Sequence, residues 1–477
     1  MICELNVCCG CGLCVHVCRH NAIQLKEDRE GFLYPFIDEQ KCVKCNLCKK
    51  KCPAINRNIR REQCIEEKKA FAGYSKKKDK LLKSSSGGAA YAIAHTILKC
   101  GGTVFGVEYN ENYRGVRFAK VTTYKELDAL SGSKYVESDR KILFDQIEEV
   151  VATGNKVLVI GLPCDIAAVR SLIGVRDNLY TCKLICRSNT SNKVLRQYLD
   201  KCEQDKRSLI KRISLRYKQE NTPMLPTKIK IEYENGSVDI EDFTKTDFGK
   251  AFQIMARQSC YQCNYKNLDG IADLTIGDFQ GMTGNEIYYN INGVSLICTH
   301  TEKGKELLSW LEDFCLYEVP YEEVMEYNWM IKMSIPKSPF RDEFSNYIRN
   351  DNLSNACDKL RREQNKVLDS IMFEFTTNGY RTAVWGIGDT NKYLFERLQM
   401  DRWNIVEVFD RSLLKVGQYF KKWKIRNISE IAQMKEQIDV LVVMIPSEEE
   451  SQLDLFLGSL GWDKKTLHVG KYKFYRG

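Results

Sequence analysis

Eight cysteines close to the N-terminus fall into two copies of one spacing, and that spacing suits iron–sulfur chemistry. Both copies read C-x2-C-x2-C-x3-C. In such runs the first three thiolates hold one [4Fe–4S] cluster and the fourth crosses to the other cluster. The rule predicts one cluster on Cys8, Cys11, Cys14 and Cys52, and a second on Cys42, Cys45, Cys48 and Cys18.

Structural zinc and a disulfide framework are the alternative interpretations of these runs. Zinc sites usually pair two C-x2-C units and have no need of three thiolates within seven residues. Disulfide frameworks belong to small secreted proteins, whereas this chain has 477 residues. The repeated spacing therefore favours a bacterial-type ferredoxin domain with two [4Fe–4S] clusters.

Four later cysteines could supply thiolates from three loops. Cys164 and Cys186 each follow a predicted strand, at the strand tips where ligand sites of open α/β sheets gather, and Cys260 and Cys263 form a C-x2-C pair. We hypothesise that this quartet binds a third [4Fe–4S] cluster, with Cys182 as a spare ligand. The alternative, buried and unreactive cysteines, fits the rest well: Cys100, Cys202, Cys298, Cys315 and Cys357.

A serine- and glycine-rich turn, 84–88, precedes a predicted helix over 89–99. Free N–H groups and the positive end of a helix dipole make such a turn a good cradle for a phosphate group. The same serines and glycines could simply cap the helix. The turn alone leaves the two interpretations open.

The length suggests roughly three domains, and we expect an α/β chain, α+β overall. We predict a ferredoxin domain over 1–57, a linker over 58–80 that holds a strand near Phe71–Tyr74, and a central mixed α/β domain over 81–345. A helical connector over 346–378 leads to a small Rossmann-like domain over 379–477. A hairpin is expected between the two cysteine runs, and strands and turns are expected over 208–250.

The Rossmann-like prediction rests on the order strand, glycine-rich turn, helix, strand and acidic residue. Gly386 and Gly388 stand in the turn, Asn391 replaces the third glycine, and Asp410 ends the next strand. Because that glycine is missing, the unit is either a dinucleotide site or a degenerate fold that serves for contacts.

Composition and charge limit the kinds of partner that the chain is expected to bind. The net charge of +9 is modest, although lysines and arginines cluster between Lys41 and Lys83. Such a cluster is either a solvated face or a docking surface for an acidic redox protein, such as a ferredoxin. We expect no nucleic acid, no transmembrane segment and a reducing cytoplasm, and leave a homo-oligomer open.

Short motifs of the central region together resemble the β-subunit family of coenzyme F420 hydrogenase and dehydrogenase. They are Ser86-Gly87-Gly88, Ser133-Lys134-Tyr135, Gly161-Leu162-Pro163-Cys164, Ser259-Cys260 with Cys263, and Ala272-Asp273 with Gly277-Asp278. The resemblance implies an iron–sulfur flavoprotein oxidoreductase that passes electrons between clusters, FAD and a deazaflavin or another small organic acceptor. It also supports the third cluster, placed beside the flavin.

Within that resemblance we expect a set of cofactor-binding residues. Ser86, Gly87, Gly88 and the following helix would hold the FAD pyrophosphate. Lys134 and Tyr135 are candidates for flavin or substrate contacts, and Asp278 for a ribose contact or a structural role. The remaining candidates are Ser133, Gly161, Pro163 and Gly277.

One departure puts the usual substrate geometry, and F420 itself, in doubt. The family shows Cys-His-Gly where this chain has Cys186-Arg187-Ser188. Two other functions stay open: a subunit that only wires a partner enzyme to a ferredoxin pool, and a non-catalytic scaffold in polysaccharide biosynthesis. A scaffold has no use for eight matched thiolates, which argues against the latter.

Overall fold

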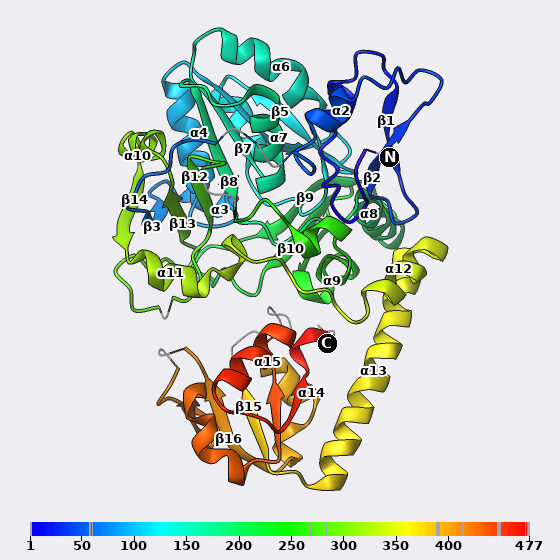
Figure 1. The fold of residues 1–477 in the computed structure, drawn as a ribbon, viewed down its shortest axis with the longest axis vertical. Coiled ribbons are helices and arrows are strands. Elements are labelled where there is room, and N and C mark those ends of the chain that lie inside the picture. The colour runs from blue at the N-terminus through cyan, green and yellow to red at the C-terminus, as the bar shows by residue number, and fades with distance from the viewer. Residues whose placement is uncertain are drawn as a thin grey trace. The chain divides into compact units, whose positions relative to one another are not determined.

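The fold is taken from a computed structural model of the chain. It describes residues 2–56, 59, 61–267, 270–282, 284–387, 392–412, 415–445, 450–472 and 474. The chain forms two compact units, one of residues 1–248 with 256–334 and one of residues 249–255 with 335–477 (Figure 1). Among the described helices, none is both long enough and apolar enough to cross a membrane.

The N-terminal segment of the first unit has the predicted hairpin between its two cysteine runs. Its elements are α1 (Leu13–His16), β1 (Ile23–Glu27), β2 (Leu33–Ile37) and α2 (Leu47–Lys50). The two strands are antiparallel, with Ile23 opposite Ile37 and Glu27 opposite Leu33. Cys14 lies in α1 and Cys48 in α2, so each cysteine run folds into a loop and one short helical turn.

A nine-stranded mixed sheet forms the body of the first unit. Its order is β14-β3-β13-β12-β8-β7-β4-β5-β6. The strands are β3 (Lys69–Ser75), β4 (Thr103–Tyr109), β5 (Val116–Val121), β6 (Ser138–Asp139), β7 (Val157–Gly161), β8 (Leu179–Leu184), β12 (Leu274–Asp278), β13 (Ser295–Thr299) and β14 (Phe314–Val319). The neighbours β12, β8, β7 and β4 run parallel to one another, whereas β3, β13 and β14 add antiparallel pairs.

Helices cover both faces of this sheet, which explains the continuous apolar run of β7. Val157 and Val159 pack with residues of α6 and α7, and Leu158 and Ile160 pack with α4 and α10. A strand buried on both faces needs no polar alternation. The helices of the unit are α3 (Lys78–Lys83), α4 (Ala89–Lys99), α5 (Tyr124–Leu127), α6 (Lys141–Ala152), α7 (Pro163–Ile173), α8 (Asn192–Lys206), α10 (Glu302–Ser309) and α11 (Tyr321–Tyr327), while α9 (Asp247–Ile254) spans the division between the units.

Strands and turns over 208–250 form the predicted small antiparallel sheet. It has the order β11-β10-β9, from β9 (Ile210–Tyr217), β10 (Lys228–Tyr233) and β11 (Val238–Asp242). Gly236, with a φ of 84°, makes the turn between β10 and β11. The left-handed backbone at this position favours glycine, as expected of a hairpin turn.

The stretch 58–80, interpreted as a linker, contributes a strand to the central sheet. β3 pairs with β13 on one side and β14 on the other, and Ala70 and Ala72 are fully buried. The strand near Phe71–Tyr74 is therefore longer than predicted. Its pairing partners lie more than 200 residues further along the chain, so no local pattern could show that the strand is central.

The second unit contains the helical stretch and a sheet with mostly parallel strands. Its helices are α12 (Arg341–Asn350), α13 (Leu353–Asn378), α14 (Lys392–Arg397) and α15 (Glu450–Ser459), and its strands are β15 (Thr382–Trp385), β16 (Ile405–Asp410), β17 (Tyr419–Phe420), β18 (Trp423–Asn427), β19 (Val440–Val443) and β20 (Lys465–His468). The sheet order is β17-β18-β16-β15-β19-β20. The five parallel strands follow the order 3-2-1-4-5 of a doubly wound sheet. Of the predicted glycine-rich turn, 386–391, residues 388–391 lie outside the described residues, and a nucleotide site there stays a prediction.

Candidate functional site

The four cysteines predicted for the first cluster line one cavity. Cys8, Cys11, Cys14 and Cys52 surround it from both cysteine runs, and each is buried. Cysteines of both runs thus line one cavity, and the crossing of the fourth ligand stays a prediction. Cys3 and Cys9 also line the cavity, and the Cys3 thiol contacts those of Cys8 and Cys52.

The second group of cysteines lies nearer to solvent. Cys45 is exposed, while Cys18, Cys42 and Cys48 are half-buried. Burial raises the pKa of the Cys48 thiol, and the nearby Cys18 and Cys45 thiols raise it further. The Ala22 N–H donates to Cys18 Sγ at 3.4 Å, the kind of contact that tunes a cluster's potential.

The first group of thiols has the number of ligands that a [4Fe–4S] cluster needs. Across the described part of the chain, no group of three or more His, Cys, Asp or Glu side chains surrounds a single metal position. A cubane takes four thiolates at its corners, around a core much larger than one ion. Four buried thiols from two loops around one cavity can supply those corners.

Three parallel strands bring the later candidates to one edge of the central sheet. β7, β8 and β12 are neighbours that run in the same direction. Cys164 follows the end of β7, Cys186 follows the end of β8, and Asp278 ends β12. The carboxyl ends of parallel strands are where open α/β sheets bind ligands.

Three of the four later cysteines lie close together, and Cys164 shares an apolar cluster with one of them. The Cys186 thiol lies close to those of Cys260 and Cys263, and burial raises the pKa of all three, that of Cys260 to about 11. Cys164 and Cys263 pack into the same apolar cluster. Such thiols stay protonated until a metal lowers their pKa, so the quartet fits a cluster that supplies its own positive charge.

A buried lysine, missed at the level of sequence, accompanies the quartet. Lys266 lies close to Cys186, Cys263 and Cys260, and burial lowers the pKa of its ammonium group. The ammonium donates to the carbonyl oxygen of Met333 at 2.8 Å, which fixes its position. A cation beside four thiolates offsets the negative charge that a bound cluster would carry.

The serine-rich turn precedes α4 as predicted. Gly88 is the N-cap residue with a φ of 95°, and the buried Ser86 Oγ donates to the Val294 carbonyl at 2.7 Å. A Cβ on Gly87 would lie 2.1 Å from the Gly73 carbonyl oxygen, so only glycine fits there. The turn is thus held rigidly, with the N-terminus of an eleven-residue helix behind it.

Two buried cations, also missed at the level of sequence, stand beside this turn. Arg216 on β9 pairs with Asp278, with Nη2 and Oδ2 2.5 Å apart. Lys218 Nζ donates to the carbonyl oxygens of Ser86 and Asn292 at 2.6 and 2.7 Å. Arg216 Nε is buried and faces no hydrogen-bond partner among the described residues. One carboxylate and two cations leave a net positive charge, which fits a pyrophosphate.

The loop 131–135 contacts both the serine-rich turn and Arg216. Ser133 Oγ lies 2.8 Å from Ser85 Oγ, and Tyr135 contacts Arg216 and packs against Phe243. The Lys134 ammonium donates to three carbonyls of its own loop, at Leu130, Ser131 and Gly132. Lys134 therefore fixes the loop, whereas Tyr135 is the member turned toward Arg216.

The remaining candidates divide between the two regions. Gly277 lies beside the serine-rich turn, since its carbonyl is 3.4 Å from Ser86 Oγ. Gly161 and Pro163 flank the start of α7 instead, near Cys164, and Pro163 is the first residue of that helix. A Cβ on Gly161 would lie 2.9 Å from Asp165 Cβ, so glycine permits the close approach of that carboxylate.

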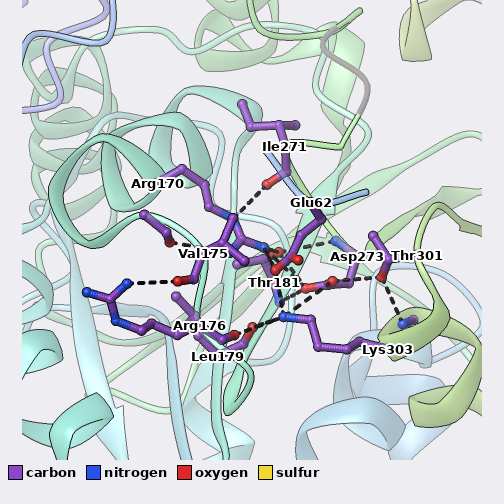
Figure 2. Close-up of polar contacts among 12 residues, drawn as sticks. Glu62, Arg170, Val175, Arg176, Leu179, Thr181, Ile271, Asp273, Thr301 and Lys303 are labelled. Carbon is purple, nitrogen blue, oxygen red and sulfur yellow. Dashed lines mark hydrogen bonds and ion pairs between the residues drawn. The ribbon is translucent and has the colours of Figure 1, made fainter. Parts of the chain in front are cut away.

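Asp273, part of the family-like motif, has a structural role. Figure 2 shows its carboxylate within a buried network around Arg170 and Lys303. Asp273 Oδ2 accepts from both the N–H and the hydroxyl of Thr181, at 2.7 and 2.8 Å. Arg170 also pairs with Glu62 at 3.0 Å, so the network ties the segment after the cysteine runs to α7 and β8.

Two family models match the chain. Residues 154–324 match the family described as the C terminus of the coenzyme F420 hydrogenase/dehydrogenase beta subunit, and residues 7–55 match the 4Fe-4S dicluster domain. The resemblance predicted from the sequence is confirmed. The chain is an iron–sulfur electron-transfer protein with a dicluster domain, and its central region is related to this oxidoreductase family.

No curated protein matches the chain. Among solved structures, the xenon-derivatized F420-reducing [NiFe] hydrogenase complex from Methanosarcina barkeri contains a chain with 20% sequence identity. That match covers 64% of this chain and 94% of the other, with a TM-score of 0.37.

Proposed function

We propose that the chain is an iron–sulfur flavoprotein oxidoreductase that passes electrons between its dicluster domain, a third [4Fe–4S] cluster, FAD and a small organic acceptor. One observation carries the proposal. The thiol-bearing loops after β7 and β8 and the Arg216–Asp278 pair at the end of β12 occupy the same edge of one sheet. A cluster and a nucleotide bound there would be neighbours.

The chain's own residues supply binding and orientation for the flavin. The N–H groups at the start of α4 and the cations Arg216 and Lys218 would hold the pyrophosphate, while Tyr135 would bound the site. FAD, when bound, supplies exchange of electron pairs with an organic acceptor and of single electrons with clusters.

The acceptor site would differ from one that contains histidine. Arg187 stands where the family has histidine, and its buried guanidinium lies close to Cys186 and Cys260. An arginine keeps its proton at neutral pH, so this position provides a fixed positive charge and no proton transfer. We infer an anionic acceptor, F420-like or otherwise, that takes its proton from another group.

The electron-donating partner would dock on the face around the second cysteine group. Cys45 is exposed, and so are the neighbouring Lys44, Lys49 and Lys50, while Val43 is 58% exposed. A basic rim around an exposed apolar side chain suits an acidic redox protein such as a ferredoxin. Electrons would enter at the cluster of Cys18, Cys42, Cys45 and Cys48.

The test is a count of iron, acid-labile sulfide and flavin per chain, on full-length protein purified without oxygen. The proposal predicts about twelve irons and one FAD, as expected of three [4Fe–4S] clusters beside a flavin. About eight irons without flavin would overturn it and favour a subunit that only wires a partner enzyme to a ferredoxin pool.

A further inference from the structure

Two buried arginines of the central region reach into the loop that holds the first cysteine run. Arg257 is 2% exposed; its Nη1 donates to the Cys8 carbonyl at 3.2 Å and its Nη2 to the Leu33 carbonyl at 2.7 Å. Its Nε donates to the carboxylate of Glu137, which is also buried. The guanidinium therefore binds a ligand loop of the dicluster domain and a carboxylate of the central region at the same time.

Arg140 makes the second connection. Its Nη1 donates to the Gly10 carbonyl at 3.3 Å, and its Nε donates to Asp165 Oδ1 at 2.7 Å. The second carboxylate oxygen of Asp165 accepts the Leu162 N–H at 2.8 Å at the start of α7. Because Asp165 directly follows Cys164, Arg140 joins the first cysteine run to a proposed ligand of the third cluster.

Arg257 joins the same two ligand sets from the other side. The Cys260 N–H donates to the Arg257 carbonyl at 2.9 Å. Arg257, whose guanidinium binds the Cys8 carbonyl, therefore also stands at the start of the loop that carries Cys260. Gly10 allows this approach, since a Cβ there would lie 2.5 Å from Arg257 Nη2. The spacing between the two loops is thus set by short, buried and charged contacts.

One cysteine outside both ligand sets lies between them. The Cys9 thiol contacts the thiols of Cys11 and Cys164, and the Tyr265 hydroxyl lies 3.6 Å from Cys9 Sγ. Cys9, Cys11, Cys164, Cys263 and Tyr265 pack in one apolar cluster. Cys9 thus contacts one cysteine of each ligand set.

We propose that Arg140 and Arg257 are positioning residues that fix the first cluster of the dicluster domain against the third cluster, with Cys9 and Tyr265 packed at the junction. The inference rests on the proposed function. One electron, supplied by a reduced redox protein, passes from the cluster of Cys8, Cys11, Cys14 and Cys52, which is oxidised, to the cluster of Cys164, Cys186, Cys260 and Cys263, which is reduced. No bond forms or breaks in that transfer.

The test uses the double variant Arg257→Met, Glu137→Gln of the full chain, purified without oxygen. Both charges are removed together because a single substitution would leave one buried charge unpaired. The matched control is Arg196→Met, Glu27→Gln. That pair also joins the central region to the dicluster domain, with Nη2 and Oε2 2.7 Å apart, but it is half-exposed and lies on β1 and α8, away from the cysteine runs.

The readouts are iron per chain and the electron paramagnetic resonance spectrum of the dithionite-reduced protein. Wild type and the control are expected to show splitting beyond that of the two clusters of the dicluster domain alone, which is measured in Cys260→Ser because that variant lacks the third cluster. The double variant is expected to keep its iron and lose the splitting; retention of both would overturn the inference. If the double variant loses iron, the same two measurements are made on Arg257→Lys, which keeps the charge beside Glu137 but has fewer hydrogen-bond donors. Retention of both iron and splitting in that variant would overturn the inference.

The two proposals fail in different ways. Wild-type protein with about eight irons lacks the third cluster, which defeats the proposed function and this inference together. Wild-type protein with about twelve irons but no splitting beyond that of Cys260→Ser keeps the proposed function and defeats only the inference that the first and third clusters are held against each other.

Discussion

Arg216 and Asp278 join the small three-stranded sheet to the ligand-binding edge of the central sheet. Arg216 lies on β9 and Asp278 ends β12, with Nη2 and Oδ2 2.5 Å apart. The carboxylate raises the pKa of the buried guanidinium, which therefore stays charged. The pair places a permanent cation beside the turn before α4, where the flavin is proposed to bind.

Replacement of Arg216 by methionine should weaken FAD binding. Loss of one charge-assisted contact to a phosphate costs about 1.5–3 kcal/mol, or roughly 10- to 150-fold in affinity. Titration of flavin fluorescence measures this, with Arg212→Met as the control because Arg212 is an exposed arginine on the same strand. Equal affinities in the two variants would remove Arg216 from the site.

FAD affinity should fall as the pH rises above neutrality. Burial, together with the nearby Arg216, lowers the pKa of Lys218 from 10.5 to about 7. A bound phosphate raises that pKa, so binding takes up a proton and affinity falls by up to about tenfold per pH unit above pH 7. Lys218→Met should flatten the titration, and an unchanged slope would contradict the assignment.

Without ligand, the same lysine should act on stability in the opposite direction. Between pH 7 and 10.5 the unfolded state holds more protons on Lys218 than the folded state does. The free energy of unfolding should therefore rise with pH across this window. Urea melts of flavin-free protein test the sign, and a fall that is specific to wild type and absent from Lys218→Met would contradict it.

The buried network of Figure 2 should contribute strongly to stability. Arg170 and Asp273 are both fully buried, and Asp273→Asn removes one of the two carboxylates that pair with the guanidinium. Breaking a buried pair in this way typically costs about 3–5 kcal/mol in the free energy of unfolding. Asp439→Asn is the control, since its pair with Arg381 is exposed to solvent and contributes little to stability. Equal urea midpoints would show that the network adds little.

The crossing of ligands between the two cysteine runs can be tested with neighbouring thiols. Cys52→Ser should lower the iron content by about four per chain, since a hydroxyl replaces a thiolate of the first cluster. Cys3→Ser should leave the iron content unchanged, although Cys3 contacts Cys8 and Cys52 in the same cavity. A loss of iron in Cys3→Ser, with none in Cys52→Ser, would show that Cys3 and not Cys52 is the fourth ligand of the first cluster.

The sequence revealed the features that are local in the chain. The cysteine runs, the hairpin between them, the turn before α4 and the strand tips before Cys164 and Cys186 all follow from short patterns. Lys134 shows the limit of such patterns, because its partners are carbonyl oxygens that no residue type reveals. In the fold the Lys134 side chain donates to its own loop, and its contact with a flavin or substrate stays a prediction.

The residues that sequence reasoning missed act across long separations. Arg257 and Cys8 are 249 positions apart, Arg140 and Gly10 are 130 apart, and Arg216 and Asp278 are 62 apart. None of the three arginines belongs to a motif. Each pairs with a backbone carbonyl or a carboxylate that only the fold brings near. The full length of β3 and its place inside the central sheet were not predicted for the same reason, since its pairing partners lie far along the chain.

The central claim is that electrons reach the flavin through the chain's own clusters, by way of the quartet. The most direct measurement mixes a reduced acidic ferredoxin with the FAD-loaded protein, without oxygen, and follows bleaching of flavin absorbance in wild type and in Cys260→Ser. The account predicts rapid bleaching in wild type, and loss of bleaching in Cys260→Ser together with loss of about four irons. Bleaching at the wild-type rate in a Cys260→Ser variant that keeps all its iron would contradict it.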